Sequence, residues 1–262
     1  MKIVVCIKQV PDTNEVRLDP VTNRLIREGV PSIINHDDKS GIEAALRIKE
    51  EVGGTVAVVC MGPGQADVAL REALAMGCDE AYLLTAKEFG GSDTFATAKI
   101  IAGALKKIGY DLVITGRQAI DGDTAQVGPQ IAENLDIPQV SYAEEVKVQG
   151  DTVTVKRQFE DRYHIIEVKM PCLLTALTEL AVPRYMHARG VIEAYENEVK
   201  VLGFEDLKDT LDPADIGLEG SPTNVVKAFG KKAKGAGTIH KDVSPDEAVE
   251  IIIKQMEEKH II

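Results

Sequence analysis

Short apolar runs alternate with amphipathic stretches along the first half of the chain. Apolar runs bounded by turn residues indicate buried strands, and apolar residues spaced three to four apart indicate helices. The strand-like runs are residues 2–8, 55–60, 80–85 and 112–115, and helical spacing covers 40–52, 66–74, 92–108 and 127–135. Strands that alternate with helices at this spacing predict an α/β fold with a doubly wound, mostly parallel sheet and helices on both faces.

Two further patterns predict additions to this sheet. Residues 16–19 and 24–26 flank Asp19-Pro20 and suggest a small hairpin. After Pro138, residues 146–148, 152–157, 164–168 and 172–175 alternate with a period near two, with Gly150 as a turn. We therefore expect a run of antiparallel strands there. Residues 181–198 are expected to form a short segment of helical or irregular structure, with a sharp turn at Pro183-Arg184-Tyr185.

The pattern changes again near residue 201. Residues 206–215 are acidic, and 227–241 contain three glycines and five lysines without a core-forming pattern, which favours an extended, solvated linker. A final helix is predicted over 244–258, because Ser244 and Glu247 form a capping-box signature ahead of an apolar stripe. We assign that stripe to Ala248, Ile251, Ile252 and Gln255. We therefore divide the chain into an α/β domain over 1–200 and a C-terminal arm over 201–262. The helix of this arm must bury its apolar stripe on its own domain or on another chain.

Composition narrows the possible classes. The net charge of −12 argues against a nucleic-acid-binding protein, and no apolar run approaches the ~18 residues of a membrane span. The N-terminus reads as a strand and not as a secretory signal. Four cysteines without Cys-x-x-Cys spacing and five histidines without a ligand-spaced pair predict neither a disulfide framework nor a metal site. A cytoplasmic location is expected.

The loop after residues 112–115 carries the most informative chemistry. The strand stops at Gly116, and a loop with two acids and two amides precedes a helix that contains Val127, Ile131 and Leu135. Backbone N–H groups exposed where a strand gives way to a helix are where open α/β sheets bind nucleotide phosphates. The loop is no Walker motif, because no Lys-Ser/Thr pair follows the glycines. An ordinary turn ending in a helix cap is the alternative for Asp121-Gly122-Asp123.

Other candidates give weaker signals. Gly62-Pro63-Gly64 opens a helix but lacks the third glycine of a dinucleotide fingerprint, and residues 35–38 read as a helix-cap cluster. No nucleophile with a base and an orienting group is visible, so we assign no catalytic residue. Asp121 and Asp123 are better suited to hold ligand hydroxyls or to cap a helix. The residues alone thus predict a nucleotide-binding α/β protein with a C-terminal segment that binds a partner.

Several motifs, in order, resemble the β (small) subunit of electron-transfer flavoprotein over essentially the whole chain. They are the first strand 2–8, Ala73-Leu74-Ala75-Met76-Gly77-Cys78-Asp79, Gly116-Arg117-Gln118-Ala119-Ile120-Asp121, 155–157 through Pro171-Cys172-Leu173-Leu174-Thr175, and Pro183-Arg184-Tyr185. Arg162 and His164 depart from the family pattern and weaken the long motif locally.

The resemblance implies a heterodimer with a larger α subunit that carries an FAD. It also implies a nucleotide site in this subunit, which matching positions place at Cys6, Asn35, His36, Asp37, Asp38, Cys60, Gly116, Arg117, Gln118, Ala119, Ile120, Asp121, Gly122, Asp123, Thr124, Ala125, Gln126 and Val127. Residues 175–184 would be a recognition loop that docks an acyl-CoA dehydrogenase, with Leu180 as its anchor. The alternative for Leu180 is a core leucine.

The stretch from Asp121 to Pro129 is similar to the electron-bifurcating branch of this family, in which FAD replaces a structural AMP. The resemblance then implies that NADH delivers a hydride to this flavin, with one electron passing to the dehydrogenase and the other to ferredoxin or flavodoxin. Two alternatives stay open. One is a non-bifurcating β subunit with AMP. The other is an ATP-using enzyme of the adenine-nucleotide hydrolase type, against which the missing phosphate loop counts.

Overall fold

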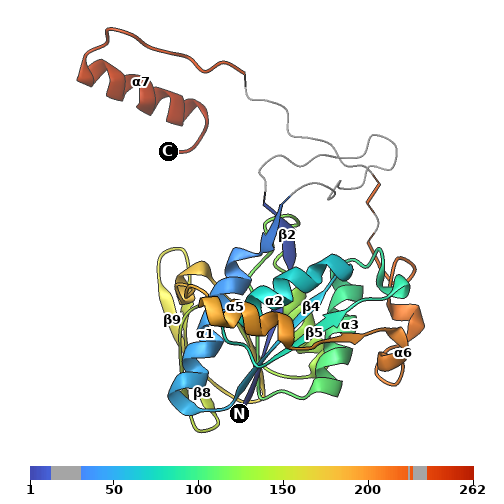
Figure 1. The fold of residues 1–262 in the computed structure, drawn as a ribbon. Helices are drawn as coiled ribbons and strands as arrows, with labels where there is room; N and C mark the ends of the chain where they lie inside the picture. Colours follow the sequence, from blue (N-terminus) through green and yellow to red (C-terminus); the bar gives the residue numbers. More distant parts are fainter. Residues whose placement is uncertain (13–30, 224, 227–234) are drawn as a thin grey trace.

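A nine-stranded sheet forms the centre of the computed structural model, which describes residues 1–12, 31–223, 225–226 and 235–262 (Figure 1). The strand order is β11-β5-β4-β1-β6-β10-β7-β8-β9. The strands from β11 to β7 pair in parallel, and β8 and β9 continue the sheet antiparallel. Their bounds are β1 Lys2–Ile7, β4 Thr55–Met61, β5 Glu80–Leu84, β6 Leu112–Gly116, β7 Gln139–Gln149, β8 Thr152–Gln158, β9 Tyr163–Lys169, β10 Cys172–Ala176 and β11 Val199–Leu202.

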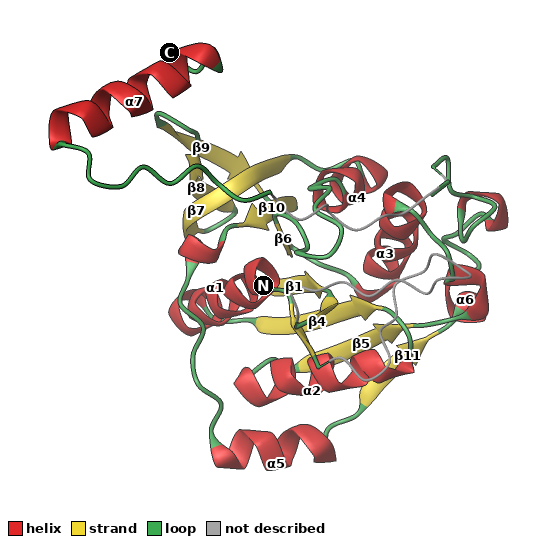
Figure 2. Cartoon of the chain, turned by 90° about the horizontal axis from the view of Figure 1, so that it is seen from above, coloured by secondary structure: helices red, strands yellow, loops and turns green. Residues whose placement is uncertain are grey.

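Helices cover both faces of this sheet, which confirms the predicted doubly wound α/β class. The α-helices of the described residues are α1 His36–Val52, α2 Asp67–Met76, α3 Thr94–Ile108, α4 Val127–Leu135, α5 Ala188–Glu196, α6 Phe204–Leu207 and α7 Pro245–Glu258, and all but α7 lie against the domain (Figure 1). Figure 2 shows α1, α2 and α5 on one side of the sheet and α3, α4 and α6 on the other. Each side packs its own apolar cluster against the strands, and both clusters contain side chains that are completely buried.

Strand β10 corrects the prediction for residues 172–175. They do not belong to the antiparallel run, because β10 lies between β6 and β7 and pairs in parallel with both. All five residues of β10 are buried, since helices cover both faces at this position. A strand buried on both faces has no period-two alternation, and Cys172-Leu173-Leu174-Thr175 is a continuous run, so the alternation predicted there was wrong.

Other elements refine the boundaries. Helix α1 begins at His36, four residues before the predicted start. Two short segments, β2 Gln9–Pro11 and β3 Ser32–Ile34, form an antiparallel pair that the pattern did not indicate. The hairpin predicted over 16–19 and 24–26 lies outside the described residues.

The C-terminal part begins on the domain itself. Strand β11 adds to the edge of the sheet, and Leu207, Leu211 and Ile216 are buried in the cluster that contains α3 and α4. Helix α7 differs, because none of its residues is buried and it lies apart from the sheet in Figure 1.

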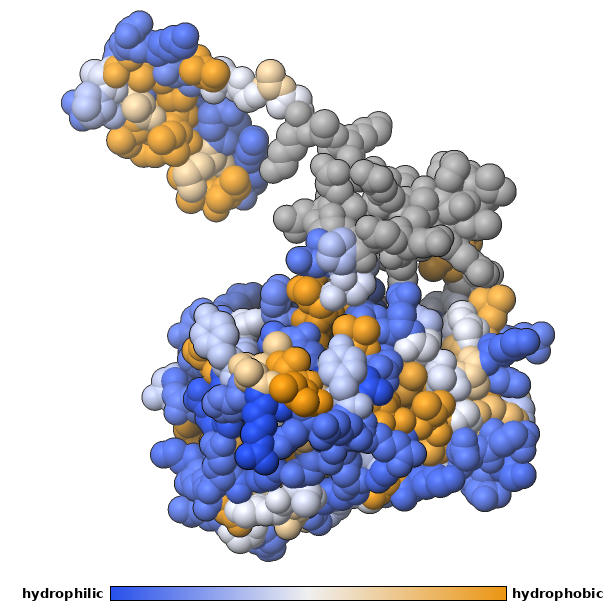
Figure 3. Space-filling model, viewed as in Figure 1, coloured by the Kyte–Doolittle hydropathy of each residue, from blue (hydrophilic) through white to orange (hydrophobic). Residues whose placement is uncertain are grey.

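The start of α7 confirms the capping-box prediction. The Ser244 hydroxyl accepts a hydrogen bond from the Glu247 N–H, and the Glu247 carboxylate accepts one from the Ser244 N–H. Its exposed apolar side chains include Val249, Ile252 of the predicted stripe, and Ile253, and Figure 3 shows apolar surface on this helix. No described helix is long and apolar enough to cross a membrane.

Candidate functional site

A cavity of about 390 Å³ opens where the carboxyl ends of β1 and β6 meet. This volume falls in the range of about 300–1,000 Å³ that is typical of small-molecule sites. The ends of the two strands, the loop after β6 and the first turns of α3 and α4 line it. A ligand crevice at the carboxyl ends of parallel strands is the position that the doubly wound topology favours.

Two helix starts face this cavity. At α3, the Asp93 carboxylate caps the helix by accepting a hydrogen bond of 3.0 Å from the Ala96 N–H. At α4, Gln126 is the N-cap residue but makes no capping bond with its side chain. The Thr94 hydroxyl donates to Gln126 Oε1 at 2.9 Å and so links the two helix starts. The uncapped start of α4 and its helix dipole therefore favour a bound anion, whereas at α3 the Asp93 carboxylate already fills that role.

The loop between β6 and α4 has an unusual backbone. Asp123 and Ala125 both adopt left-handed conformations, with φ of 54° and 53°. Gly122 does not, and a Cβ atom built there would meet nothing within 4 Å. Neither backbone strain nor packing within the described chain therefore requires glycine at 122. An absent side chain beside an open cavity is what a closely approaching ligand needs.

Glycines at the two ends of the loop have a different role. A Cβ at Gly128 would lie 2.6 Å from Thr115 Oγ1 and 2.8 Å from Thr175 Cγ2, so this glycine lets α4 pack against the strands. A Cβ at Gly116 would collide with the Asp38 carboxylate.

Residues at the start of α1 form hydrogen bonds to the loop between β6 and α4 and to the strand ends beside it. Asn35 Nδ2 donates to the Gln118 carbonyl at 2.8 Å, and Asn35 Oδ1 accepts from the Ile120 N–H at 3.1 Å. The Asp38 carboxylate accepts from the N–H groups of Lys8 at 2.7 Å and Gly116 at 2.9 Å, so it joins the ends of β1 and β6. These buried polar groups satisfy backbone donors and acceptors that the loop leaves unpaired.

Burial shifts the pKa of two carboxyl groups at the start of α1. Burial raises the pKa of Asp38 to about 7, against hydrogen bonds from Lys8, Asn35 and Gly116 that lower it. Burial also raises the pKa of Asp37, and the Arg117 guanidinium, whose Nε lies 3.5 Å from Asp37 Oδ2, partly opposes this.

Two side-chain pairs shape the loop above the strands. Lys8 Nζ lies 2.7 Å from Asp121 Oδ1, and Gln118 Nε2 donates to the Asp123 carboxylate. Lys8 and Arg117 both line the cavity and bring positive charge to it. Asp121 and Asp123 are thereby engaged with protein groups, as expected for residues that orient the loop.

The structure brings many of the residues expected at the nucleotide site into this cavity. Those that line it are Cys6, Asp38, Gly116, Arg117, Gln118, Ala119, Gly122, Asp123, Thr124, Ala125, Gln126 and Val127. Asn35, His36, Asp37, Cys60, Ile120 and Asp121 are not among the lining residues. Cys60 is buried in the core, where burial raises its pKa to about 12, and His36 is exposed.

Sequence reasoning missed Lys8 and the α3 side of the cavity. The additional lining residues include Lys8, Met61, Ser92, Asp93, Thr94, Thr97 and Ile101. Asp93 is the N-cap of α3, one residue after the helix start that the pattern predicts. A polar helix start shortly after a predicted parallel strand was the available signal, because such helix starts lie at the ligand edge of the sheet.

The expected recognition loop lies at another edge of the domain. Leu180 ends a short turn of helix at Thr178–Leu180 and is half-buried, packed against the apolar cluster that contains α1 and α2. The Ser40 hydroxyl donates to the Leu177 carbonyl and accepts from the Ala181 N–H, so this turn is attached to α1. Val182 and Tyr185, which follow, are exposed.

Fold and cavity together define a doubly wound α/β protein with a nucleotide-type crevice. Comparisons with known proteins specify the family. Residues 22–206 match the electron transfer flavoprotein domain. The chain is 58% identical to the electron transfer flavoprotein subunit beta of Thermoanaerobacterium thermosaccharolyticum, with each chain covered completely.

Two other relatives also match over the full length of both chains. Identity is 52% to subunit CarD of the caffeyl-CoA reductase-Etf complex of Acetobacterium woodii. It is 49% to the acryloyl-CoA reductase electron transfer subunit gamma of Anaerotignum propionicum. The chain therefore belongs to the electron transfer flavoprotein family, as a β subunit.

Proposed function

We propose that this β subunit holds an FAD in the cavity at the ends of β1 and β6 and takes part in flavin-based electron bifurcation. It would act in a heterodimer with a larger α subunit, between NADH, ferredoxin or flavodoxin, and an acyl-CoA dehydrogenase. The observation that carries the proposal is the cavity of about 390 Å³ bounded by two helix starts and a loop with an unobstructed glycine.

The chemistry of the lining residues fits a dinucleotide. Backbone N–H groups of the loop and the start of α4 would meet the pyrophosphate, together with the Lys8 ammonium. Thr124 and Gln126 also line the cavity and would supply further side-chain hydrogen bonds. The isoalloxazine ring would supply the redox chemistry, and the protein would supply position and electrostatics.

The choice of FAD over AMP rests on the loop and on the relatives. Residues 121–129 resemble the bifurcating branch, and two relatives are named as subunits of acyl-CoA reductase systems. AMP as a structural ligand remains the second candidate, because its phosphate could occupy the same helix starts. Family membership over most of the chain does not favour an ATP-using enzyme. We also propose that α7, at the end of the C-terminal arm, buries its apolar side chains on the α subunit, and that the protein works in the cytoplasm.

The direct test is to denature the purified heterodimer and to identify the released nucleotides. Two FAD per heterodimer supports the proposal, and one FAD with one AMP refutes it in favour of the plain electron carrier.

A variant then ties the nucleotide to the cavity. Gly122→Val should reduce the flavin from two to one per heterodimer and abolish NADH-dependent ferredoxin reduction, because the side chain would occupy the ligand's approach. Gly64→Val is the matched control, since Gly64 also has open space around it and does not line the cavity. Full flavin retention in the Gly122→Val variant would place the nucleotide elsewhere.

A further inference from the structure

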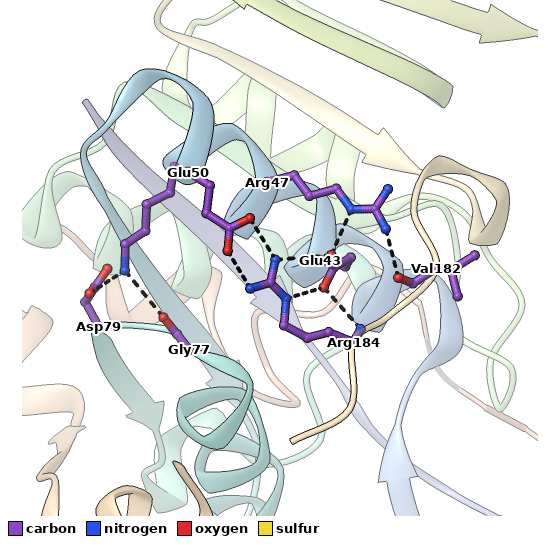
Figure 4. A network of polar contacts seen from close by, with 8 residues as sticks. Glu43, Arg47, Glu50, Gly77, Asp79, Val182 and Arg184 are labelled. Carbon is purple, nitrogen blue, oxygen red and sulfur yellow. Dashed lines mark hydrogen bonds and ion pairs between the residues drawn. The ribbon is translucent and has the colours of Figure 1, made fainter. Parts of the chain in front are cut away.

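Polar networks attach two later segments of the chain to helices of the domain. In one, Arg184 donates to the carboxylates of Glu43 and Glu50 on α1 (Figure 4), and none of these three residues lines the cavity at the ends of β1 and β6. In the other, residues 217–223 are bonded to the start of α3, where residues 92–94 do line that cavity. The second network therefore joins the C-terminal part of the chain to the candidate nucleotide site.

Asp93 is the centre of this second network. Its Oδ1 atom accepts a hydrogen bond from the Ala96 N–H at 3.0 Å and so caps α3. Its Oδ2 atom accepts from the Thr223 N–H at 3.0 Å and from the Thr223 hydroxyl at 2.7 Å. The Asp93 N–H donates in turn to the Ser221 hydroxyl at 2.9 Å. Both carboxylate oxygens of Asp93 are thus directed at donors of the protein.

The segment that carries Thr223 is held closely against the loop before α3. The Ser92 hydroxyl accepts from the Gly217 N–H at 3.1 Å, and the Ser221 hydroxyl donates to the Gly217 carbonyl at 2.6 Å. Gly217 has a φ of 66°, and a Cβ atom there would collide with the Glu88 carbonyl oxygen. The close approach therefore requires glycine, and it fixes the backbone that leads to Thr223.

The charge of Asp93 matters for an anionic ligand in the cavity. A carboxylate repels phosphate, and Asp93 lines the same cavity as the uncapped start of α4. Burial acts to raise the pKa of Asp93, but hydrogen bonds from Thr223 and Ala96 outweigh it and lower that pKa. These bonds to an ionised carboxylate are of the strong, charge-assisted kind. They partly neutralise the carboxylate where a phosphate would otherwise be repelled.

Thr94 extends the network across the cavity. Its hydroxyl donates to Gln126 Oε1 at 2.9 Å, and Gln126 is the N-cap residue of α4. Because Asp93 caps α3, its position fixes the first turn of that helix and with it the Thr94 hydroxyl. Residues 217–223 are thereby connected, through Asp93 and Thr94, to the helix start that favours a bound anion.

From these contacts we infer that Thr223 is a positioning residue of the nucleotide site, which holds the Asp93 carboxylate on protein donors and so fixes the start of α3 beside the bound phosphates. This role rests on the proposed function, because it requires a nucleotide in the cavity, and it applies to FAD and AMP alike. The sequence motifs placed all the site residues between Cys6 and Val127. The site would therefore include a segment that begins about 90 residues further along the chain.

The test measures the rate at which the purified heterodimer releases its nucleotide, FAD or AMP, after dilution. Thr223→Val keeps the shape of the side chain and removes its hydroxyl, so release should be about fivefold faster. Thr223→Ser keeps the hydroxyl and should release the nucleotide at nearly the wild-type rate. Thr210→Val is the matched control, because the Thr210 hydroxyl donates to the Leu207 carbonyl and does not line this cavity. Wild-type release from Thr223→Val, or equal effects of Thr223→Val and Thr223→Ser, overturns the inference.

A double-mutant cycle tests whether the effect passes through Asp93. Asp93→Ser retains an N-cap residue but lacks the oxygen that accepts from Thr223. In this background Thr223→Val should change release by almost nothing, and additive effects overturn the positioning role. Hydrogen exchange at the Ala96 amide should be faster in Thr223→Val than in the wild type, because a less firmly held Asp93 protects that amide less. Unchanged exchange also overturns the role.

Two further variants keep the outcome decisive. Ser221→Ala removes the acceptor of the Asp93 N–H and repeats the test if Thr223→Val does not assemble. Gly122→Val separates this inference from the proposed function. Loss of the nucleotide in Gly122→Val with wild-type release from Thr223→Val overturns only the role of Thr223. Full retention in both variants refutes the nucleotide site itself, together with the inference.

Discussion

Replacing Asn35 by alanine tests whether the start of α1 holds the nucleotide loop. Asn35 is 1% exposed, and its amide bridges the Gln118 carbonyl and the Ile120 N–H across more than 80 residues of sequence. Alanine would leave both backbone groups without these partners. An unmet buried polar group costs about 1–3 kcal/mol, and the exposed side of the loop lets water recover part of that. We expect a local loss of about 2 kcal/mol.

That loss should appear in nucleotide binding, because the ligand must then order the loop itself. A change of about 2 kcal/mol corresponds to about a 30-fold weaker affinity. The assay is nucleotide release from the heterodimer on dilution, combined with hydrogen exchange at the Ile120 amide. Asn134→Ala is the matched control, since the Asn134 amide donates to the Gln130 carbonyl within α4 and does not line the cavity, and it should change affinity by less than about twofold.

Two results would refute this reasoning. Unchanged affinity and unchanged exchange in Asn35→Ala would mean that the loop does not depend on the bridge. Weaker affinity with an Ile120 amide that stays protected would mean that Asn35 contacts the nucleotide directly, as the family resemblance implied.

Two further predictions concern the C-terminal helix and the buried acid. Ile252→Asn should weaken the heterodimer by about 1–3 kcal/mol if the exposed apolar side chains of α7 are buried on the α subunit. Lys254→Asn on the same helix is the control and should not weaken it. Equal dissociation constants for both variants would count against that packing. Burial raises the pKa of Asp38 to about 7, so between about pH 4 and pH 7 the folded chain keeps a proton that the unfolded chain has lost. Its contribution to stability is therefore present at low pH and lost as the pH rises through 7. The denaturant midpoint of the wild type, relative to Asp38→Asn at the same protein concentration, should fall from pH 5 to pH 8, and a difference that does not change with pH would contradict the assigned environment.

Local sequence patterns were sufficient to predict the elements that depend on interactions between neighbouring residues. Strands β1, β4, β5 and β6 are continuous apolar runs bounded by turns, and this is how buried parallel strands read in a sequence. The start of α7 was readable because both halves of a capping box lie within four residues. The loop from Gly116 to Val127 was identified for the same reason, since strand, glycine and helix follow one another directly. These features depend on interactions of short range in sequence.

Tertiary structure decided which of these elements meet. β10 follows β9 in the chain, but it inserts between β6 and β7, and its five buried residues contain no signal for that position. Ser92, Asp93 and Thr94 reach the cavity only because α3 and α4 begin at the same edge of the sheet. Asn35, which the resemblance places at the nucleotide site, bonds to a loop more than 80 residues further along the chain. The sequence does not show that Leu180 is half-buried and Tyr185 exposed, because this depends on the packing of the short turn Thr178–Leu180 against the core. In each case the partner lies tens of residues away, so the outcome depends on sheet order and on packing, which residue periodicity does not encode.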